Sequence, residues 1–577
     1  MLLGLADVWM RKGDSKHADE ALARAMDLSA ASDSQGRARI YALRAVSEKR
    51  RGAFDAAIRD ALAALDLVQG GAEGDLDDEL GCLNLLGNIY SDLGRFDRAR
   101  SYYEKALRAN VKRYPVRLTE SLNGIGFALQ WGGDLPGAVR SYVEALHFSC
   151  GSGAPERTLH YTDADGRAQE LACAVTGNTG VALSSVGQIQ TELGRPQVGL
   201  PSLLEALAIR RQGGGENKTD IARSLLDLGS AYRDLGDDDR ALSTFREGLA
   251  LSQEAEDIGL QTAFLYRWAI LDRNRGRNRE ALEKMETALH FVEEVRNGVS
   301  NPDQRISFLA SKRQYYELLI DLLLRLHEAQ PGGAAYPQQA LFACEMAKAR
   351  SLLDFLRSGR IRLGGPELDE LRQHEQDLEA QRAFLHAELR RLGGHPSRED
   401  VTVALLQREL AENSAQSLAV ADEIRTRFPR YAEVSDPRPL NPSSIQAQVL
   451  EADTALVEYL VGADSTYLFV LTREKLAAYR LPLGVAELAR QVATLRSFLD
   501  TPQEELAQAY LDQGYALYRQ LLAPAASVLA RKRTFLIAAD GPLLKLPFEA
   551  LLIEHRKLDG RTTFRNLPYL FLQHPLA

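Results

Sequence analysis

The chain has 577 residues, of which 45% are hydrophobic, so it is long enough for more than one domain of about 100–200 residues. Its net charge of -9 excludes a global positive field, and we predict no direct nucleic-acid partner. No apolar run approaches the about 18–20 residues that cross a membrane, and no signal-peptide pattern begins the chain, so we predict no membrane partner either.

A repeated unit fills the first 300 residues, and its clearest copy is LGNIYSDLGRFDRARSYYEKAL, which begins at Leu86. Its turn glycine recurs at Gly13, Gly52, Gly94, Gly133, Gly194, Gly236 and Gly276. A small residue follows five positions later, at Ala18, Ala57, Ala99, Ala138, Gly199, Ala241 and Ala281. Another precedes the glycine by seven positions, at Ala6, Ala45, Gly87, Gly126, Gly187, Gly229 and Ala269. Small residues are needed there because two helices about 8–10 Å apart leave no room for larger side chains.

This pattern resembles the tetratricopeptide repeat, a pair of helices that usually takes about 34 residues. The repeats here are longer, as in kinesin light chains, whereas HEAT and armadillo repeats lack the glycine and alanine pattern. The resemblance implies a right-handed α-solenoid with a concave face over residues 1–300, built from about seven elongated repeats. One longer interval, near residues 148–171, is rich in Gly and Asp, and we interpret it as an inserted irregular surface loop.

The concave face is the first candidate site. In such repeats the first helix of each pair lines the groove, and five polar residues are aligned there: Asn84, Asn88, Asn123, Gln188 and Arg233. A side-chain amide offers a donor and an acceptor together, so it can pair with the backbone of an extended peptide of any sequence. We predict a protein or peptide ligand in this groove. The alternative, that these are ordinary solvated positions, stays open.

Residues 301–436 are predicted to form a helical linker module. Leu371, Leu378, Leu385 and Leu392 stand seven apart, and a second amphipathic run passes through Ile424 and Phe428. The two runs indicate a helical hairpin whose apolar residues pack on each other rather than on a partner.

From residue 437 to 577 the periodicity changes. DTALVEYLVG, STYLFVLT and KLAAYRLP predict strands, and RTFLIAAD predicts a further apolar strand typical of a parallel sheet. A helix from Val485 to Leu499 and another through YLDQGYALYRQLLAPA lie between them. The predicted fold class is therefore mainly α: a solenoid, a helical hairpin module and an incomplete α/β domain.

Four stretches from about Asn301 onward, YYELLIDLLLRL, ALFACEMAKARSLLDFL, ALVEYLVGADSTYLFVLT and FLIAADGPLLKLPFEALL, together resemble the CHAT family of caspase-like peptidases associated with tetratricopeptide repeats. The resemblance implies a catalytic Cys, whose thiolate attacks a peptide carbonyl, and a His that acts as base and acid. In the family these residues follow the segment equivalent to LPYLFLQHPLA, with which this sequence ends. Here no His precedes a Gly, and no Cys follows Cys344. We therefore expect the catalytic pair beyond Ala577, assign no catalytic residue, and predict no peptidase activity for this chain alone.

The remaining chemistry-bearing residues predict structure rather than function. Cys344 lies among helix formers, which predicts a buried structural cysteine. His160, Asp163, Asp165 and Cys173 match neither zinc nor EF-hand spacing, so we predict no metal and no cofactor.

The four cysteines show no CxxC pair and no disulfide-framework spacing, which indicates a reducing compartment; we expect a cytoplasmic protein, and a bacterial one. Two functions follow. The chain is either the ligand-binding sensor that regulates an attached caspase-like peptidase or a non-catalytic adaptor. Whether it is a fragment or a natural short product stays open, and the sequence predicts no oligomeric state.

Overall fold

The computed structural model of the chain describes residues 2–12, 15–29, 33–69, 76–110, 114–151, 157–163, 165–176, 178–212, 218–299, 302–330, 335–358, 442–500, 506–557 and 567–574, with scattered positions between 367 and 428. The chain divides into two compact units. The solenoid unit comprises residues 1–311 and 362–436, and the sheet unit comprises residues 312–361 and 437–577. Residues 301–436 are thus shared between the units, and the predicted three-domain division stays a prediction.

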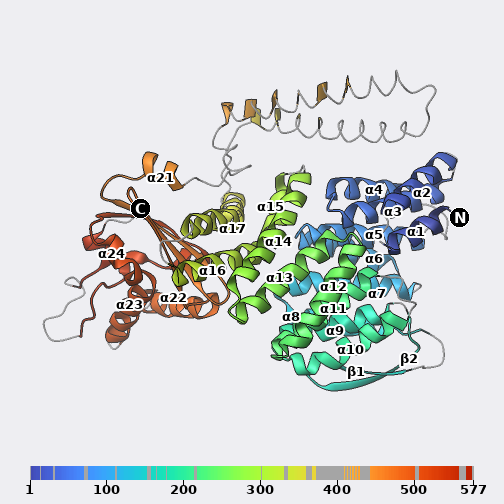
Figure 1. Cartoon of the computed structure of the whole chain (residues 1–577), viewed down its shortest axis with the longest axis horizontal. Coiled ribbons are helices and arrows are strands. Elements are labelled where there is room, and N and C mark those ends of the chain that lie inside the picture. The colour runs from blue at the N-terminus through green and yellow to red at the C-terminus, as the bar shows by residue number, and fades with distance from the viewer. Residues whose placement is uncertain are drawn as a thin grey trace. The chain divides into compact units, whose positions relative to one another are not determined.

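The solenoid unit consists of helix pairs that follow one another in chain order, coloured blue to green in Figure 1. The helices are α1 (Leu2–Lys12), α2 (Ser15–Leu28), α3 (Ser34–Arg50), α4 (Phe54–Val68), α5 (Leu76–Asp92), α6 (Phe96–Ala109), α7 (Pro115–Trp131), α8 (Leu135–Ser149), α9 (Thr179–Glu192), α10 (Pro196–Gln212), α11 (Lys218–Asp234), α12 (Asp238–Glu254), α13 (Ile258–Asn274), α14 (Asn278–Gly298) and α15 (Pro302–Ser311). Each predicted repeat is one pair, from α1 with α2 to α13 with α14.

The turn glycines and the small residues behave as the repeat pattern predicts. Gly52, Gly94, Gly133, Gly194, Gly236 and Gly276 have φ between 70° and 88°, a left-handed conformation that glycine adopts without a steric penalty. Gly13 lies outside the described residues. At Gly229 an added Cβ would lie 2.5 Å from the ring of Phe245, and Ala241 is fully buried. The close helix crossing therefore depends on the absence of larger side chains.

The insertion before the fifth repeat is a β-hairpin, so our interpretation of it as an irregular loop was wrong. Strand β1 (Arg157–Thr162) pairs antiparallel with β2 (Ala168–Cys173). Leu159 and Tyr161 are buried in the core formed with α8 and α9, while His160 between them is exposed. This alternation is the period of a strand that packs on one face.

A disulfide joins Cys150, at the end of α8, to Cys173, at the end of β2. The cysteine spacing gave no indication of this bond, because the two cysteines are 23 residues apart and meet only through the hairpin. The argument from cysteine spacing to a reducing compartment therefore fails. Cys82 and Cys344 are free and buried. Among the described residues no helix is long and apolar enough to cross a membrane.

The sheet unit contains the predicted strands. Its elements are α16 (Arg313–Ala329), α17 (Tyr336–Ser358), α21 (Pro442–Gln448), β3 (Thr454–Val461), β4 (Thr466–Thr472), β5 (Leu476–Leu481), α22 (Val485–Asp500), α23 (Ala507–Leu521), η3 (Ala523–Ala525), α24 (Ala526–Leu529), β6 (Thr534–Ala538), η4 (Gly541–Lys545), η5 (Phe548–Ala550) and α25 (Leu570–Gln573). The strand order is β5-β4-β3-β6. Only β3 and β6 are parallel, so the sheet is mixed.

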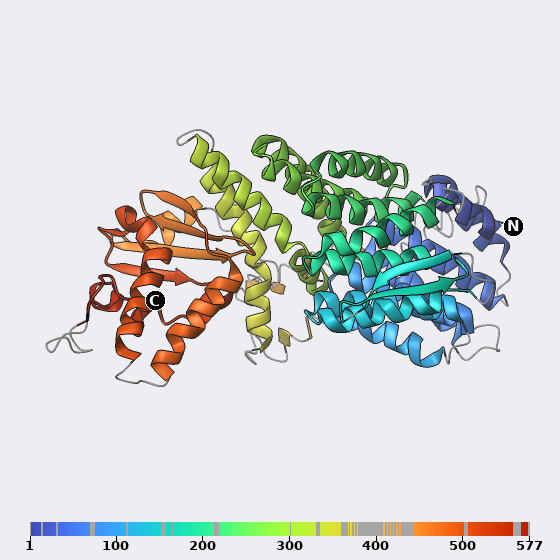
Figure 2. The same ribbon diagram turned by 90° about the horizontal axis from the view of Figure 1, so that it is seen from below.

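Alternate residues of β3 face opposite sides of the sheet, as the period of a strand requires. Val457 and Tyr459 belong to the core formed with α22 and α23, whereas Glu458 contacts Lys348 of α17. The sheet therefore has helices on both faces, and Figure 2 shows its strands in orange to red with helices of the same unit beside them.

The predicted helical hairpin is only partly described. Its apolar residues Leu368, Leu378, Val420 and Ile424 form one buried cluster, against which Leu371 and Phe428 pack. Leu385 and Leu392 lie outside the described residues. The described leucines thus pack within the hairpin, as predicted.

Candidate functional site

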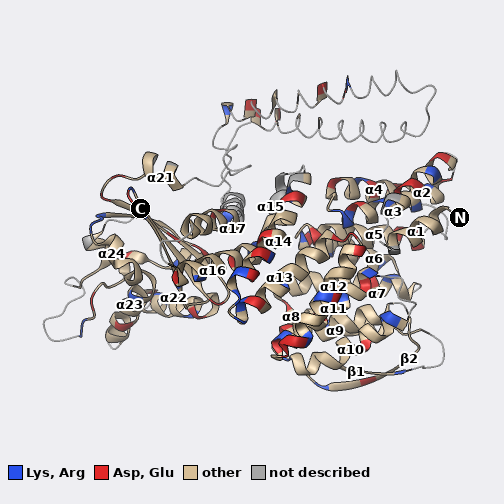
Figure 3. Ribbon diagram, in the orientation of Figure 1, with Lys and Arg blue, Asp and Glu red and all other residues tan. Residues whose placement is uncertain are grey.

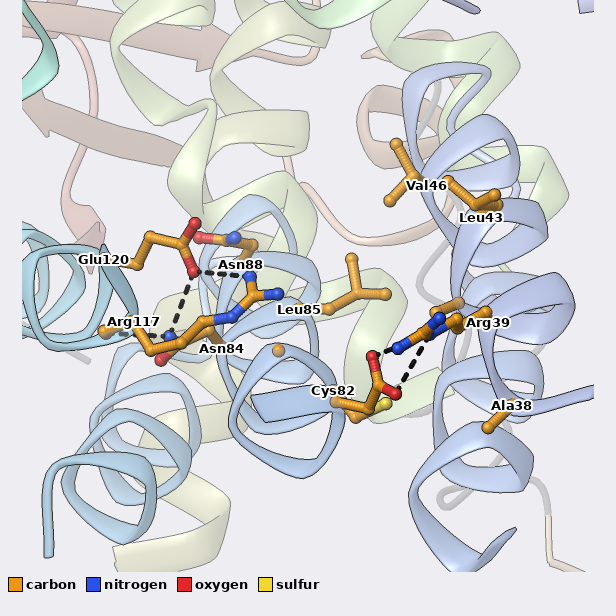
Figure 4. Close-up of a pocket in the computed structure, with 13 residues that line it drawn as sticks. Ala38, Arg39, Leu43, Val46, Cys82, Asn84, Leu85, Asn88, Arg117 and Glu120 are labelled. Atoms are coloured by element: carbon orange, nitrogen blue, oxygen red, sulfur yellow. Dashed lines mark hydrogen bonds and ion pairs between the residues drawn. The ribbon is translucent and has the colours of Figure 1, made fainter. Parts of the chain in front are cut away.

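A cavity of about 250 Å³ lies between α3, α5 and α7, the first helices of three successive repeats. First helices line the inner wall of this kind of solenoid, so the cavity opens on the concave face. Figure 4 shows its lining, in which Leu85 lies between Arg39 on one side and Arg117 with Glu120 on the other, and Leu43 and Val46 lie on the same helix as Arg39. The volume exceeds the about 150 Å³ that holds benzene but is below the about 300–1,000 Å³ of small-molecule sites. It suits one large side chain.

Asn84 lines this cavity, but its amide is already bonded. It is 2% exposed, its Nδ2 donates to the Arg117 carbonyl at 3.2 Å, and its Oδ1 accepts from Ser121 Oγ at 2.8 Å. These bonds join α5 to α7. Asn84 therefore fixes the distance between two walls of the cavity.

Asn88 is exposed at the same cavity and has an open donor. Its Oδ1 accepts from Tyr103 Oη at 2.8 Å, and Nδ2 has no partner among the residues that the structure describes. Burial raises the pKa of Tyr103 well above its usual value, so the hydroxyl stays protonated and remains a donor. The bond to Tyr103 thereby fixes the orientation of the amide and leaves Nδ2 for a ligand.

The charged groups around the cavity are paired. Arg39 Nε lies 3.0 Å from Asp78 Oδ2, and Arg117 lies 3.0 Å from Asp77 and 3.2 Å from Glu120. Burial, followed by the Asp78 carboxylate, raises the pKa of Cys82 to about 12, so its thiol is neither a nucleophile nor a metal ligand near neutral pH.

The other predicted residues lie on later helices. Asn123 of α7 has a buried Oδ1 without a hydrogen-bond partner among the described residues. Gln188 of α9 donates to Glu192 Oε1 at 3.1 Å. Arg233 of α11 pairs with Asp234 at 2.7 Å, and its buried Nη1 has no hydrogen-bond partner in the described part of the chain. The structure thus brings Asn84 and Asn88 together at one cavity and leaves the other three apart, and their role in binding stays a prediction.

The cavity shows which positions of the repeat face the groove. Arg39, Gly81 and Glu120 are equivalent positions of three repeats and all line it. Asn88 and Gln188 occupy the same position of their repeats, counted from the turn glycine, whereas Arg233 occupies a different position of its repeat. Our sequence analysis missed the charged residues of the lining, although their spacing from the turn glycine would have identified them.

Arg223 of α11 is influenced by carboxylates of other repeats. Arg223 of α11 is exposed and makes no hydrogen bond or ion pair with the described residues. The surrounding protein disfavours its charge, but the carboxylates of Asp257 and Asp92 outweigh this and raise its pKa. Asp92 belongs to α5, so a carboxylate of a distant repeat contributes to this shift. In Figure 3 basic and acidic residues are interspersed along these helices.

Cys344 in the sheet unit is not a reactive thiol. It is fully buried and donates to Glu458 Oε1 at 3.5 Å. Burial and then the Glu458 charge raise its pKa well above the usual range. Across the described part of the chain, no group of three or more His, Cys, Asp or Glu residues could hold a metal ion.

Comparison with known proteins identifies the repeats. A tetratricopeptide-repeat family model matches residues 36–110 and 178–254, so the chain contains tetratricopeptide repeats. No curated protein matches the chain. The matched segments end well before the sheet unit, where the caspase-like resemblance stays a prediction.

Several solved structures are similar at low identity. A Rap protein complexed with competence and sporulation factor is 15% identical over 57% of this chain and 87% of its own, with a TM-score of 0.38. BtubC (BKLC) from P. vanneervenii is 18% identical over 43% of this chain and 89% of its own, with a TM-score of 0.28. The TPR2AB domain of yeast Sti1 in complex with pHSP90 is 15% identical over 49% of this chain and 98% of its own, with a TM-score of 0.19.

Proposed function

We propose that this chain, which carries tetratricopeptide repeats, binds an extended protein or peptide along the concave face of its solenoid unit. We further propose that this binding regulates a caspase-like cysteine peptidase attached to it. The observation that supports the first part best is the cavity between α3, α5 and α7, where Asn88 offers a donor without a partner among the described residues.

The chemistry of the cavity favours a polypeptide. Its volume suits one side chain, and the Asn88 amide suits a backbone carbonyl beside that side chain. Because Arg39, Arg117 and Glu120 are already in ion pairs, the cavity has no spare charge with which to select a charged side chain. We therefore expect an aliphatic or aromatic residue in it.

The second part of the proposal is supported by the sequence resemblance of residues 301–577, and the mixed sheet with helices on both faces is compatible with it. The alternative is a non-catalytic adaptor, and the cysteines of this chain are compatible with either function because the sensor proposal places the catalytic pair beyond Ala577. Cys82 and Cys344 are buried with raised thiol pKa values, and Cys150 and Cys173 are joined in a disulfide. No thiol of this chain is thus available as a nucleophile.

The binding test uses the full 577-residue chain and a phage library of random 12-residue peptides. For peptides selected on the wild type, Asn88→Ala should raise Kd about threefold to tenfold, the effect of one neutral hydrogen bond. Val46→Trp should fill the cavity and raise Kd more than about tenfold. The matched control is Leu204→Trp on α10, whose side chain is exposed outside the groove. Peptides that bind Asn88→Ala and Val46→Trp as well as wild type would refute binding at this cavity.

A second experiment separates the sensor from the adaptor. The longest natural chain that contains this sequence is assayed for peptide cleavage with and without a selected peptide. Cleavage that depends on the peptide supports regulation of a peptidase. Absence of cleavage under both conditions favours the adaptor.

A further inference from the structure

The last helices of the solenoid unit return to its second and third repeats. Val295 of α14 lies against Gly52, where an added Cβ would be 2.6 Å from a methyl group of Val295. Phe308 of α15 packs on Phe54 with 6.0 Å between the ring centroids, and both residues are 4% exposed. We call residues 295–299 together with α15 the clip.

The clip also contacts the turn that follows α5. An added Cβ at Gly94 would lie 2.7 Å from the Ser307 carbonyl oxygen and 2.8 Å from the Ser311 Cβ, so α15 lies directly on the backbone of this turn. Gly52 and Gly94 are the turn glycines after α3 and α5, which form two of the three walls of the cavity. The clip therefore holds the ends of both helices at one spacing.

Along the cavity, α3 and α5 are joined by long polar side chains. Arg39 Nε lies 3.0 Å from Asp78 Oδ2, and nearer the ends of the two helices Lys49 Nζ lies 2.7 Å from Asp92 Oδ2. Such partly exposed ion pairs contribute little stability, and their side chains follow a change in helix spacing by rotating about single bonds. The ion pairs therefore permit a change in this spacing, which the clip opposes.

The clip is held in place by few apolar side chains. Four of its described residues are buried: Val295, Val299, Phe308 and Leu309. A helix of 10 residues with so little buried surface opens more readily than the longer helices inside the repeats. The clip is also the last element of the solenoid unit, since α15 ends at Ser311 and α16 begins at Arg313. A change in α15 therefore acts on the segment of chain that enters the sheet unit.

We propose that ligand binding releases the clip: a polypeptide side chain that enters the cavity changes the spacing of α3 and α5, and the clip then detaches from the turns at Gly52 and Gly94. This inference rests on the proposed function, because its ligand is the polypeptide of the concave face. The close contacts at both glycines fit one spacing only, so a change in either direction weakens them. Because such coupling is reciprocal, a fixed clip weakens ligand binding and a released clip strengthens it.

An engineered disulfide tests this coupling in the full-length chain. In Gly52→Cys with Val295→Cys the two Cβ atoms would lie 3.3 Å apart, close to the about 3.5–4.5 Å of natural disulfides. For cysteine-free peptides selected from the phage library on the wild type, the oxidised variant should bind about tenfold more weakly than the reduced variant. The wild type is the control for reduction of the native Cys150–Cys173 disulfide, and its Kd should be the same under both conditions.

A second variant releases the clip. Phe308→Ala removes the ring that packs on Phe54 and should bind the same peptides about threefold more tightly than the wild type. The matched control is Gly229→Ala, which crowds the crossing of α11 and α12 and touches neither the clip nor the cavity. It should leave Kd unchanged, so that a general loss of stability is distinguished from release of the clip.

Amide hydrogen exchange reports on the clip itself. A saturating selected peptide should accelerate exchange in α15 of the wild type more than about fivefold, because the helix opens more often when it is detached. In Val46→Trp, where the cavity is filled, the same peptide should leave exchange in α15 unchanged.

The outcomes separate the two proposals. If no peptide binds, or if the selected peptides bind Val46→Trp and Asn88→Ala as well as the wild type, both the function of the cavity and the release of the clip are refuted. If Val46→Trp blocks binding but the peptide does not accelerate exchange in α15, only the release of the clip is refuted. Equal or tighter binding by the oxidised double-cysteine variant would refute it as well.

Discussion

The two units of this chain keep their structures by different means. In the solenoid unit each helix packs mainly on its sequence neighbours, through small residues such as Gly229 and Ala241. In the sheet unit, β3 is bonded to α17 and to the residues after β6. Lys348 donates to Glu458, which is 110 positions away in the sequence, and the Val461 amide donates to Asp540, which is 79 positions away. The solenoid unit thus depends on many contacts between sequence neighbours, and the sheet unit depends on contacts between residues far apart in the sequence.

In the sheet unit, buried carboxylates form the ion pairs that hold two helices on the sheet. Glu458 and Asp540 are 3% and 2% exposed. Lys348 Nζ lies 2.9 Å from Glu458, and Arg313 of α16 pairs with Asp540. Two helices are thus attached to the sheet through buried ion pairs. Loss of one partner of such a pair is costly because the other charge stays buried.

The largest expected effect is therefore in the sheet unit. Lys348→Met should reduce its stability by about 3–5 kcal/mol, because the Glu458 carboxylate stays buried without its cation. Amide hydrogen exchange in β3 and β6 should accelerate. All three tryptophans, Trp9, Trp131 and Trp268, belong to the solenoid unit, so the urea midpoint from tryptophan fluorescence should not change.

A double variant controls for the substitution itself. Lys348→Met with Glu458→Leu removes both charges and should recover most of the lost stability. Equal hydrogen exchange in the single and the double variant would contradict the ion-pair account.

Next in size is the disulfide of the solenoid unit. Replacing Cys150 and Cys173 by Ser opens a loop of 23 residues and should cost about 3 kcal/mol, seen as a lower urea midpoint in tryptophan fluorescence. A reducing agent should lower the wild-type midpoint to that of the variant and leave the variant unchanged. A wild-type midpoint that does not respond to reduction would contradict the disulfide.

A smaller effect is expected at one repeat crossing. Gly229→Ala places a methyl group 2.5 Å from the Phe245 ring and should destabilise the solenoid unit by about 1–3 kcal/mol. Gly4→Ala in α1 is the matched control, since nothing lies within 4 Å of its new Cβ. It should stabilise by about 0.5–1 kcal/mol, as expected for Gly to Ala in a helix. The two urea midpoints should therefore move in opposite directions, and a shift of both in the same direction would refute this account.

The smallest effect is a difference in pH dependence. Burial, then Glu458, raises the pKa of Glu345 to about 8, while burial raises the pKa of Asp227 to about 6. Each acid is protonated more readily in the folded state, so stability falls as pH rises from the ordinary carboxyl pKa to the raised one and is level above it. Between pH 6 and 8 only the sheet unit should lose stability through these two groups.

Hydrogen exchange of β3 at several pH values measures this slope, after correction for the intrinsic exchange rate. Glu345→Gln should flatten it, and Asp227→Asn should not. An unchanged slope in Glu345→Gln would show that this residue is not the titrating group.

Much of the fold was predictable because its signals are local. Gly94 and Gly236 mark turns that need positive φ, and the short apolar run Thr454–Val461, bounded by turn residues, indicates a strand. The hairpin was missed although Leu159 and Tyr161 alternate with exposed residues, because the Gly- and Asp-rich composition around them was given more weight. Of the candidate site, the repeat pattern could place Asn88 at the groove. It could not predict that the Asn88 Nδ2 has no hydrogen-bond partner among the described residues.

The sequence by itself determined the helix pairs, the turns and the strands, because backbone preference and side-chain period act between residues a few positions apart. Only the tertiary structure decided that Cys150 meets Cys173, that Tyr103 fixes the amide of Asn88, and that Phe308 packs on Phe54. Each of these contacts depends on how whole helices and strands pack against one another. A pattern of neighbouring residues in the sequence does not determine that packing.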